Sequence, residues 1–399
     1  MGNISTEMLL MIVCSIVILS YIFSILSKHS KIPSVLLLLA TGIIARYISD
    51  AEGWGLTLPE KLVEFLGVVG LIMIVLEAGL DLELGRNKLG LIRNSFFAAL
   101  VIFIVSAAGI TTGLYWWLRE PIEKCIVYSI PLSIMSSSIV LPSIHPLSAV
   151  KKEFLVYEAS FSDMLGILVF NYFTAKEVYT ASAVGTFFLN IVIAIVLSVI
   201  FSIILFVILT KSSMNIKFFL IFSLLIILYE GGKMLQLPSL LIILFFGLLM
   251  RNWNMIKIPY IRLLFTEEKL KETTNILHYI TAESSFLIRT FFFILFGFSI
   301  DVKVIAESDI LLAGTIIVGI LLFVRFLYLR FFLKESVYPE VFFIPRGLIT
   351  ILLFYNIPDN LKLQRFSDGI LFFVILVTSV IMMIGMIFYK NREIVSAPE

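Results

Sequence analysis

The sequence of 399 residues is poor in charged residues, histidine and cysteine. Charged residues make up 15% of the chain and hydrophobic residues 60%, whereas a typical soluble domain is about 25% charged. The mean hydropathy of +1.06 reflects the same shortage of polar side chains. A chain of this composition cannot be enclosed as one or two soluble domains, so we expect a polytopic membrane protein.

The scarce residue types also exclude several classes of function. A net charge of +2 provides neither a basic surface for nucleic acid nor an acidic tail. The three histidines are scattered, which argues against a histidine-built metal site, and Cys14 and Cys125 fall in apolar runs that are typical of small core residues. The sequence contains no nucleotide-binding loop and no Gly-x-Gly-Asp run of an intramembrane aspartyl protease. We therefore expect no enzyme, no bound cofactor and no nucleic-acid partner.

Thirteen apolar segments, most of them near the roughly 20 residues that a bilayer core requires, are separated by short charged loops. Lysine and arginine are about twice as frequent on one set of alternate loops, which puts the N-terminus outside and the C-terminus in the cytoplasm of a cell (inner) membrane. This pattern predicts an all-α, multi-pass membrane protein with about 13 transmembrane helices. The predicted segments are Met8–Leu26, Pro33–Ile48, Leu62–Leu80, Phe96–Leu118, Cys125–Ile144, Phe154–Phe173, Val184–Leu209, Ile216–Tyr229, Leu235–Met250, Ala282–Ile300, Leu311–Leu333, Val341–Tyr355 and Ile370–Tyr389.

Two similar motifs indicate an internal repeat of opposite orientation. Ala78-Gly79-Leu80-Asp81-Leu82 ends the third segment, and Phe298-Ser299-Ile300-Asp301-Val302 ends the tenth. Because the motifs are seven segments apart, an odd number, the second half must be inverted relative to the first. We expect a single transmembrane transporter domain over residues 1–398, inverted repeats over roughly residues 8–173 and 216–389, and a short C-terminal cytoplasmic tail over residues 390–399.

Segments five and twelve, which are also seven apart, both contain proline beside polar residues within an apolar run. Broken helices in corresponding positions of two inverted repeats are typical of secondary transporters, which bind their substrate at the breaks. We therefore expect two broken, crossing helices. The residues concerned are Pro131, Ser136, Ser137, Ser138 and Pro142 in segment five, and Pro345, Arg346 and Gly347 in segment twelve.

Charged residues inside predicted spans are costly, so each one is a candidate for function. Glu158 and Asp163 lie on the sixth segment, where five residues correspond to about 140° of helix rotation, so the two carboxylates face different neighbours. Glu158 lies at the same predicted depth as Arg325, although Arg289 is an alternative partner and Glu77 a competing carboxylate. Asp163 has no obvious basic partner, and a low dielectric favours its neutral form.

Four motifs in order resemble signatures of the monovalent cation:proton antiporters, the sodium/proton exchanger superfamily. The resemblance implies that Asp163 is the carboxylate that binds both Na⁺ and H⁺, that Glu158 and Arg325 form a structural ion pair, and that the family's usual homodimer is formed. The motifs are Leu76-Glu77-Ala78-Gly79-Leu80-Asp81, Glu158-Ala159-Ser160-Phe161-Ser162-Asp163, Phe293-Ile294-Leu295-Phe296-Gly297-Phe298-Ser299-Ile300-Asp301 and Ile344-Pro345-Arg346-Gly347-Leu348.

The sequence differs from the family pattern around the expected cation site. Ser162 stands where the family has asparagine before the aspartate, and Ala159 stands where it has serine after the glutamate. The family's unwound helix often carries an acid, whereas this chain has the hydroxyls of residues 136–138. We expect Ser162 and these serines to contribute to the site, and Glu77 is a candidate for the missing carboxylate.

These residues predict a secondary active antiporter in the lipid bilayer. A monovalent cation and a proton would compete for Asp163, and alternating access would carry one for the other, with Na⁺ expected and Li⁺ and K⁺ left open. If Glu158 stays ionised in its pair, exchange is one-for-one and electroneutral. The alternative is a cation-coupled solute symporter or a channel on the same inverted-repeat fold.

Overall fold

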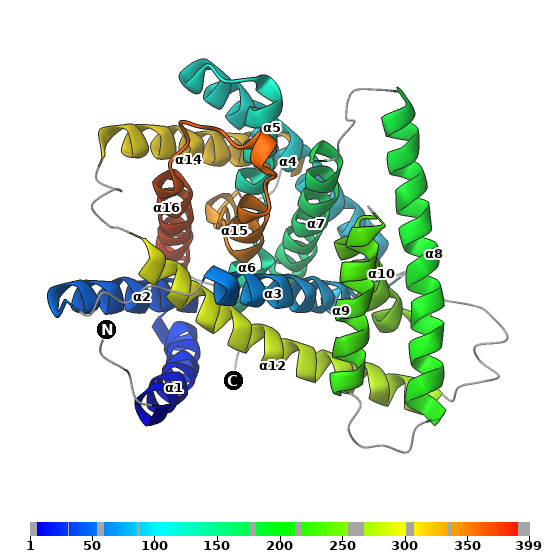
Figure 1. The fold of residues 1–399 in the computed structure, drawn as a ribbon. Helices are drawn as coiled ribbons and strands as arrows, with labels where there is room; N and C mark the ends of the chain where they lie inside the picture. Colours follow the sequence, from blue (N-terminus) through cyan, green and yellow to red (C-terminus); the bar gives the residue numbers. More distant parts are fainter. Residues whose placement is uncertain are drawn as a thin grey trace, which may run out of the picture. The chain divides into compact units, whose positions relative to one another are not determined.

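The structure is a computed structural model, and it describes residues 6–30, 32–53, 60–85, 88–144, 146–174, 181–211, 218–235, 237–253, 267–300, 307–333 and 337–389. Within these residues the chain is helical and contains no β-strand (Figure 1). The expected tail over residues 390–399 and the motif residue Asp301 lie outside the described residues.

The described helices correspond one by one to the thirteen predicted segments when α5 and α6 are counted as two halves of segment five. The predicted all-α fold is therefore confirmed. The helices are α1 (Thr6–Ser30), α2 (Ser34–Ala51), α3 (Glu60–Asp81), α4 (Leu89–Leu118), α5 (Ile122–Ser133), α6 (Ser137–Ser143), α7 (Ala149–Phe173), α8 (Ala181–Lys211), α9 (Phe218–Met234), α10 (Ser239–Arg251), α12 (Glu267–Ser299), α14 (Ser308–Tyr328), α15 (Leu348–Tyr355) and α16 (Asp368–Phe388).

Seven helical segments among the described residues are long and apolar enough to cross a membrane, with α5 and α6 counted together. The α7 helix is not among them, and α15 is too short with 8 residues. The α12 helix begins at Glu267, well before the predicted start of its span at Ala282. The charged stretch before the predicted span therefore continues the apolar helix, because lysine and glutamate are good helix formers.

The chain forms two compact units, which are described separately. The first unit comprises Met1–Glu64, Gly90–Gly166 and Arg289–Glu399, and the second comprises Phe65–Leu89 and Ile167–Ile288. Both broken segments, most of α7, and all of α14 and α16 belong to the first unit. Each unit takes segments from both halves of the sequence, and the repeat boundaries stay a prediction.

Pairs of glycines allow close helix contact within each unit. In the first unit, a Cβ added to Gly42 of α2 would lie 2.8 Å from the Phe298 backbone nitrogen, beside Gly297 of α12. In the second unit, a Cβ added to Gly79 of α3 would lie 2.7 Å from the Leu244 carbonyl oxygen, beside Gly247 of α10. Small residues at such contacts let helix backbones approach within membranes. The segments of α2 and α10 are seven apart, as are those of α3 and α12, so the two contacts involve corresponding segments of the repeat, which stays a prediction.

The expectation for the two cysteines is met by one of them. Cys125 is buried on α5, but Cys14 is exposed on α1, so the prediction of a core position for Cys14 was wrong. The α1 helix carries many exposed apolar side chains, including Leu10 and Met11. A hydrophobic run therefore does not distinguish a buried face from one that faces lipid.

Candidate functional site

The predicted break in segment five lies between α5 and α6. The α5 helix ends at Ser133, Ile134 (φ −77°, ψ 125°) and Ser136 (φ −77°, ψ 115°) are extended, and α6 begins at Ser137. Pro131 lies in the last turn of α5 and has no N–H to donate. The serine hydroxyls that follow compete for backbone hydrogen bonds, which weakens the helix further.

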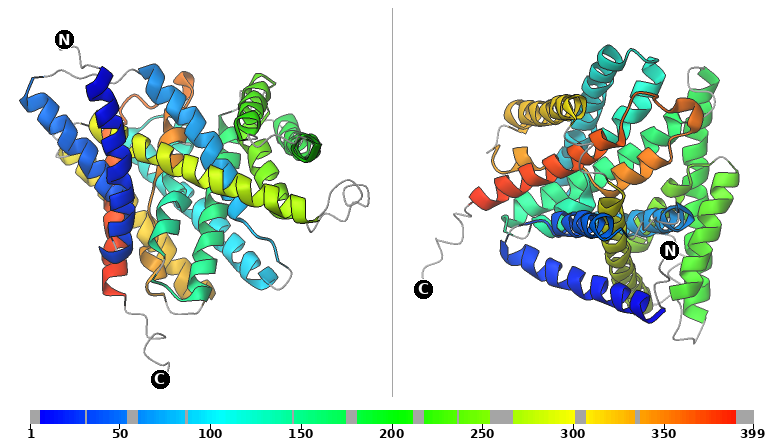
Figure 2. Two further views of the ribbon diagram at one scale, coloured as in Figure 1. Left: turned by 90° about the horizontal axis from the view of Figure 1, so that it is seen from below. Right: turned by 60° about the vertical axis from the view of Figure 1, so that its left-hand side comes forward.

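The break in segment twelve lies directly before α15 and contacts the first break. Residues 343–347 are not helical, and Pro345 disfavours a helical conformation of the residue before it. The Ser136 backbone N–H donates a hydrogen bond to the Pro345 carbonyl at 3.0 Å. A Cβ added to Gly347 would collide with the Ser136 side chain. The two breaks therefore cross at close range, and α15 packs against α5. Figure 2 shows the ribbon from two further sides.

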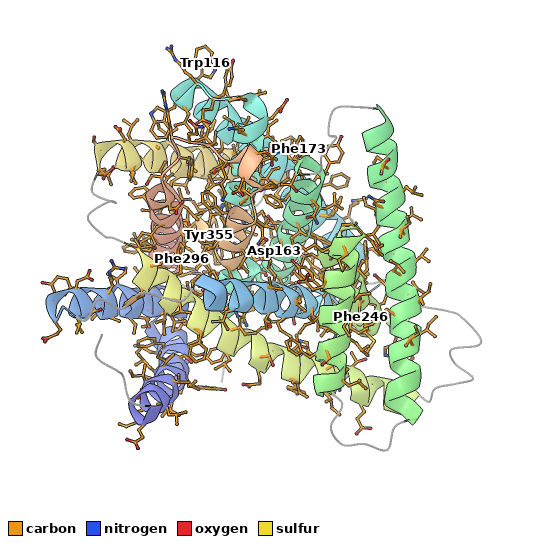
Figure 3. All side chains as sticks on the ribbon, viewed as in Figure 1. Trp116, Asp163, Phe173, Phe246, Phe296 and Tyr355 are labelled. Atoms are coloured by element: carbon orange, nitrogen blue, oxygen red, sulfur yellow. The ribbon has the colours of Figure 1, made fainter. Side chains whose placement is uncertain are left out.

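Asp163 and its neighbour Ser162, both on α7, accept hydrogen bonds from backbone N–H groups at the break between α5 and α6. The Ser137 backbone N–H donates to Asp163 Oδ2 at 3.2 Å, and the Met135 backbone N–H donates to Ser162 Oγ at 2.9 Å. Asp163 lies on α7 and is labelled in Figure 3. It is 1% exposed, and its Oδ1 has no hydrogen-bond partner among the described residues. The carboxyl group therefore has one oxygen anchored at the break and one oxygen buried without a partner.

The three serines of the break are buried but make different contacts. The hydroxyls of Ser136 and Ser138 lie 2.8 Å apart and hydrogen-bond to each other. Ser137 contributes its backbone N–H to Asp163, as the first residue of α6. The structure thus brings these serines, Ser162 and Asp163 together within the first unit.

Glu158 and Arg325 form a buried pair on the same unit. Arg325 Nη1 lies 2.6 Å from Glu158 Oε1, and Nη2 lies 2.9 Å from Oε2, which is the bidentate geometry of a strong charge-assisted contact. Both side chains are 1% exposed. Of the two arginines considered from the sequence, Arg325 contacts Glu158, while Arg289 lies on α12.

A second ion pair near the breaks was missed by the sequence reasoning. Lys151 Nζ, in the first turn of α7, lies 2.6 Å from Glu340 Oε1, and Arg325 Nε donates to the Glu340 carbonyl at 2.6 Å. Glu340 is 7% exposed and begins the short 3₁₀ turn Glu340–Phe342, which precedes the second break. The available signal was an acid directly before the predicted start of segment twelve at Val341.

Arg346 satisfies carbonyl groups that the breaks expose. Its Nε donates to the Leu132 carbonyl at 2.6 Å and its Nη1 to the Ile344 carbonyl at 3.1 Å, while its backbone N–H donates to Thr378 Oγ1 at 3.2 Å. Leu132 lies in the last turn of α5, where helix carbonyls have no intrahelical partner and a positive charge is favourable. A small cavity between Arg346 and the ion pair has a polar lining of Ser133, Glu158, Ser162, Arg325 and Arg346.

Glu77 lies half-buried on α3 in the second unit, and its grouping with Asp163 stays a prediction. Asp81, the last residue of the same motif, lies in the same unit, with its Oδ1 2.7 Å from His278 Nε2 of α12. This aspartate therefore links two helices of the second unit.

The described residues include no group of three or more histidine, cysteine, aspartate or glutamate side chains that could hold a metal ion together. In the first unit, the candidate site instead offers one carboxylate, several hydroxyls and the backbone groups of two breaks. One negative charge with neutral oxygens suits a monovalent cation.

The helical fold and the crossed breaks define a multi-pass membrane transporter. The sequence matches the family described as "Sodium/hydrogen exchanger, transmembrane" over residues 14–389. The chain therefore belongs to the sodium/hydrogen exchanger family, as its motifs predict, and it is a transporter rather than an enzyme.

The structure is similar to that of the sodium proton antiporter MjNhaP1 from Methanocaldococcus jannaschii. For that protein's structure at pH 8 the TM-score is 0.69 at 15% sequence identity, covering 96% of this chain and 99% of that chain. For its electron-microscopy structure the TM-score is 0.65 at 16% identity, covering 98% and 100%. At this identity the likeness shows the shared fold. No curated protein matches the sequence.

Proposed function

We propose that this protein is a secondary active antiporter that exchanges a monovalent cation for H⁺ at Asp163. Na⁺ is the expected cation, and Li⁺ and K⁺ are the alternatives. Membership of the exchanger family supports exchange of a cation for a proton. The observation that carries the assignment to Asp163 is its buried carboxyl group, in which Oδ2 accepts the Ser137 N–H and Oδ1 has no partner among the described residues.

The chemistry of a buried carboxyl group supports competition between the two ions. An unpaired carboxylate in a low dielectric is costly, so it takes up either a proton or a cation. A hard cation must exchange its water for other oxygens, and the hydroxyls of residues 136–138 and 162 and the carbonyls at the breaks are candidates. Because protonated Asp163 binds a cation poorly, each cation that binds displaces a proton.

Glu158 has a different role in this proposal. Its bidentate contact with Arg325 leaves it paired with a group that is always charged, so it contributes no proton to the cycle. With Asp163 as the exchanging group, one cation replaces one proton and transport is electroneutral. Glu77 is the candidate for a second titrating group.

Several further properties belong to the same proposal. An ion gradient supplies the energy, and the protein needs no cofactor. The excess of lysine and arginine on alternate loops supports an N-terminus outside and a C-terminus in the cytoplasm of the cell membrane. The family resemblance supports a homodimer.

The test is proton movement in everted membrane vesicles that have been acidified inside, followed with a pH-sensitive dye. Addition of Na⁺, Li⁺ and K⁺ in turn should release internal protons for each cation that the protein carries. Vesicles without the protein provide the control. The proposal is wrong if no cation moves protons. A symporter would instead require an added solute, and a channel would carry cation current without any coupled proton movement.

A further inference from the structure

Ser160 has a buried hydroxyl group that is not used by its own helix. The residue is 1% exposed on α7, and its Oγ has no hydrogen-bond partner among the described residues. Helical serines can satisfy their hydroxyls with the carbonyl four residues earlier. Ser133, Ser198 and Ser202 do so here, at 2.7 to 2.8 Å. The Ser160 hydroxyl therefore differs from these three, because it makes no hydrogen bond to a carbonyl of its own helix.

The position of Ser160 on α7 sets it beside the exchanging carboxyl group. Residues three apart on a helix are neighbours on one face, which places Ser160 next to Asp163. Two residues correspond to about 200° of rotation, so Ser160 lies on the side of α7 opposite to Glu158 and its ion pair. Asp163 Oδ1 and Ser160 Oγ are thus two buried oxygens without partners on adjacent positions of one helix face.

We propose that Ser160 is a further ligand of the transported cation, binding it through Oγ together with Asp163 Oδ1. This inference rests on the proposed function. A hydroxyl is a neutral oxygen ligand of the kind that a hard cation takes in place of water. At this point of α7, Ser160 supplies a hydroxyl group and the neighbouring Ala159 supplies none.

Ser160 contributes to the affinity for the cation and not to the uptake or release of the proton. Loss of one neutral ligand should raise the half-saturating Na⁺ concentration about tenfold, because a contact of this kind contributes roughly as much as one hydrogen bond to a charged group. The maximal rate should stay near that of the unchanged protein, since Asp163 still exchanges its proton. A merely structural role for Ser160 would lower the maximal rate or the stability instead.

The experiment uses the purified full chain and measures two quantities. The first is Na⁺ binding, followed as the Na⁺-dependent rise in unfolding temperature, and the second is Na⁺-driven proton movement in proteoliposomes. Ser160→Ala should shift both Na⁺ dependences about tenfold to higher concentration. Ser160→Thr, which keeps the hydroxyl, should stay closer to the unchanged protein. If Ser160→Ala does not fold, Ser160→Cys replaces it, because sulfur is a poor ligand for a hard cation.

Ser49→Ala provides the matched control. Ser49 is also 1% exposed and its hydroxyl also has no partner among the described residues, but it lies on α2. This variant should show the Na⁺ dependence of the unchanged protein. The inference is overturned if Ser160→Ala binds Na⁺ as tightly as the unchanged protein, or if Ser49→Ala shows the same shift. If the unchanged protein binds Na⁺ but moves no protons, the proposed function is wrong. The Na⁺-binding measurement on Ser160→Ala would still decide whether Ser160 is a ligand.

Discussion

Ser137, at the start of α6 beside the break that separates it from α5, donates its backbone N–H to Asp163 Oδ2 of α7 at 3.2 Å. Because Ser137 is the first residue of α6, this N–H has no acceptor within its own helix. The break therefore creates the donor that holds the carboxyl group. A hydrogen bond to a carboxylate is stronger than one to a neutral acid, so the protonation state of Asp163 is coupled to the geometry of the break.

The pair of Glu158 and Arg325 should be required for stability. Glu158→Gln leaves the 1% exposed guanidinium without its counter-charge, and such a loss costs about 3 to 5 kcal/mol. Glu158→Ala combined with Arg325→Ala should be milder than either single change, because no buried charge remains. Thermal unfolding of the purified variants measures this coupling.

The exposed ion pair of Asp359 and Lys362 serves as the control for the Glu158 and Arg325 variants. Their charged atoms lie 2.7 Å apart, and the two side chains are 94% and 54% exposed. Asp359→Asn should therefore change the unfolding temperature little, since water screens such contacts. Additive losses in the Glu158 and Arg325 variants would show that the buried contact is not the one that stabilises the protein.

Gly347→Ala should disturb the crossing of the two breaks. The added Cβ would collide with the Ser136 side chain, and forcing extra volume into a packed site costs about 1 to 3 kcal/mol. We expect lower stability and slower exchange, measured on the same proteoliposome preparation. Gly319→Ala on α14 is the control, because a Cβ there has nothing within 4 Å, and it should exchange normally. Normal exchange by Gly347→Ala would argue against a close crossing.

Ser162 should act through its hydrogen bond to the break. Ser162→Ala leaves the Met135 N–H buried without an acceptor, at a cost of about 1 to 3 kcal/mol. Ser162→Asn restores the residue usual in the family and provides a side-chain carbonyl that can accept the same hydrogen bond. Exchange rates should therefore be retained in Ser162→Asn and reduced in Ser162→Ala. Faster exchange by Ser162→Ala than by Ser162→Asn would show that Ser162 does not act through this hydrogen bond.

Transport should be insensitive to membrane potential if one cation replaces one proton. The test imposes a potassium diffusion potential with valinomycin on proteoliposomes whose sodium and proton gradients are balanced. No net sodium movement is expected. Sodium movement driven by the potential would indicate more than one proton per cation, and Glu77→Gln would then test whether Glu77 releases the second proton.

The helical spans and the two breaks could be predicted from the local sequence, whereas the contacts between the helices and the breaks could not. Apolar length predicted every segment, and Pro131 and Pro345 located the breaks, because a missing N–H acts on the residues nearest to it. Glu340 and Thr378 were missed, since their roles depend on Lys151, Arg325 and the Arg346 backbone, which are distant in sequence or on other elements.

Within the site, the sequence identified the residues but not their orientation. Matching depth suggested Arg325 for Glu158, but depth could not decide against Arg289, because that choice depends on which helices pack together. Ser162 was expected at the cation site, and that role stays a prediction, but the sequence did not indicate that its hydroxyl accepts a hydrogen bond from the break. Ser160 was not singled out, because an unsatisfied hydroxyl is visible only once its surroundings are built.

The most direct measurement of the central claim is ²²Na⁺ uptake by Asp163→Asn in proteoliposomes with an outward proton gradient. The asparagine oxygen can still accept the Ser137 N–H, so the variant should fold and unfold at nearly the same temperature as the unchanged protein. An amide neither releases a proton nor neutralises a cation, so uptake should fall to the level of empty liposomes. Uptake at half the rate of the unchanged protein or more would contradict the assignment of exchange to Asp163.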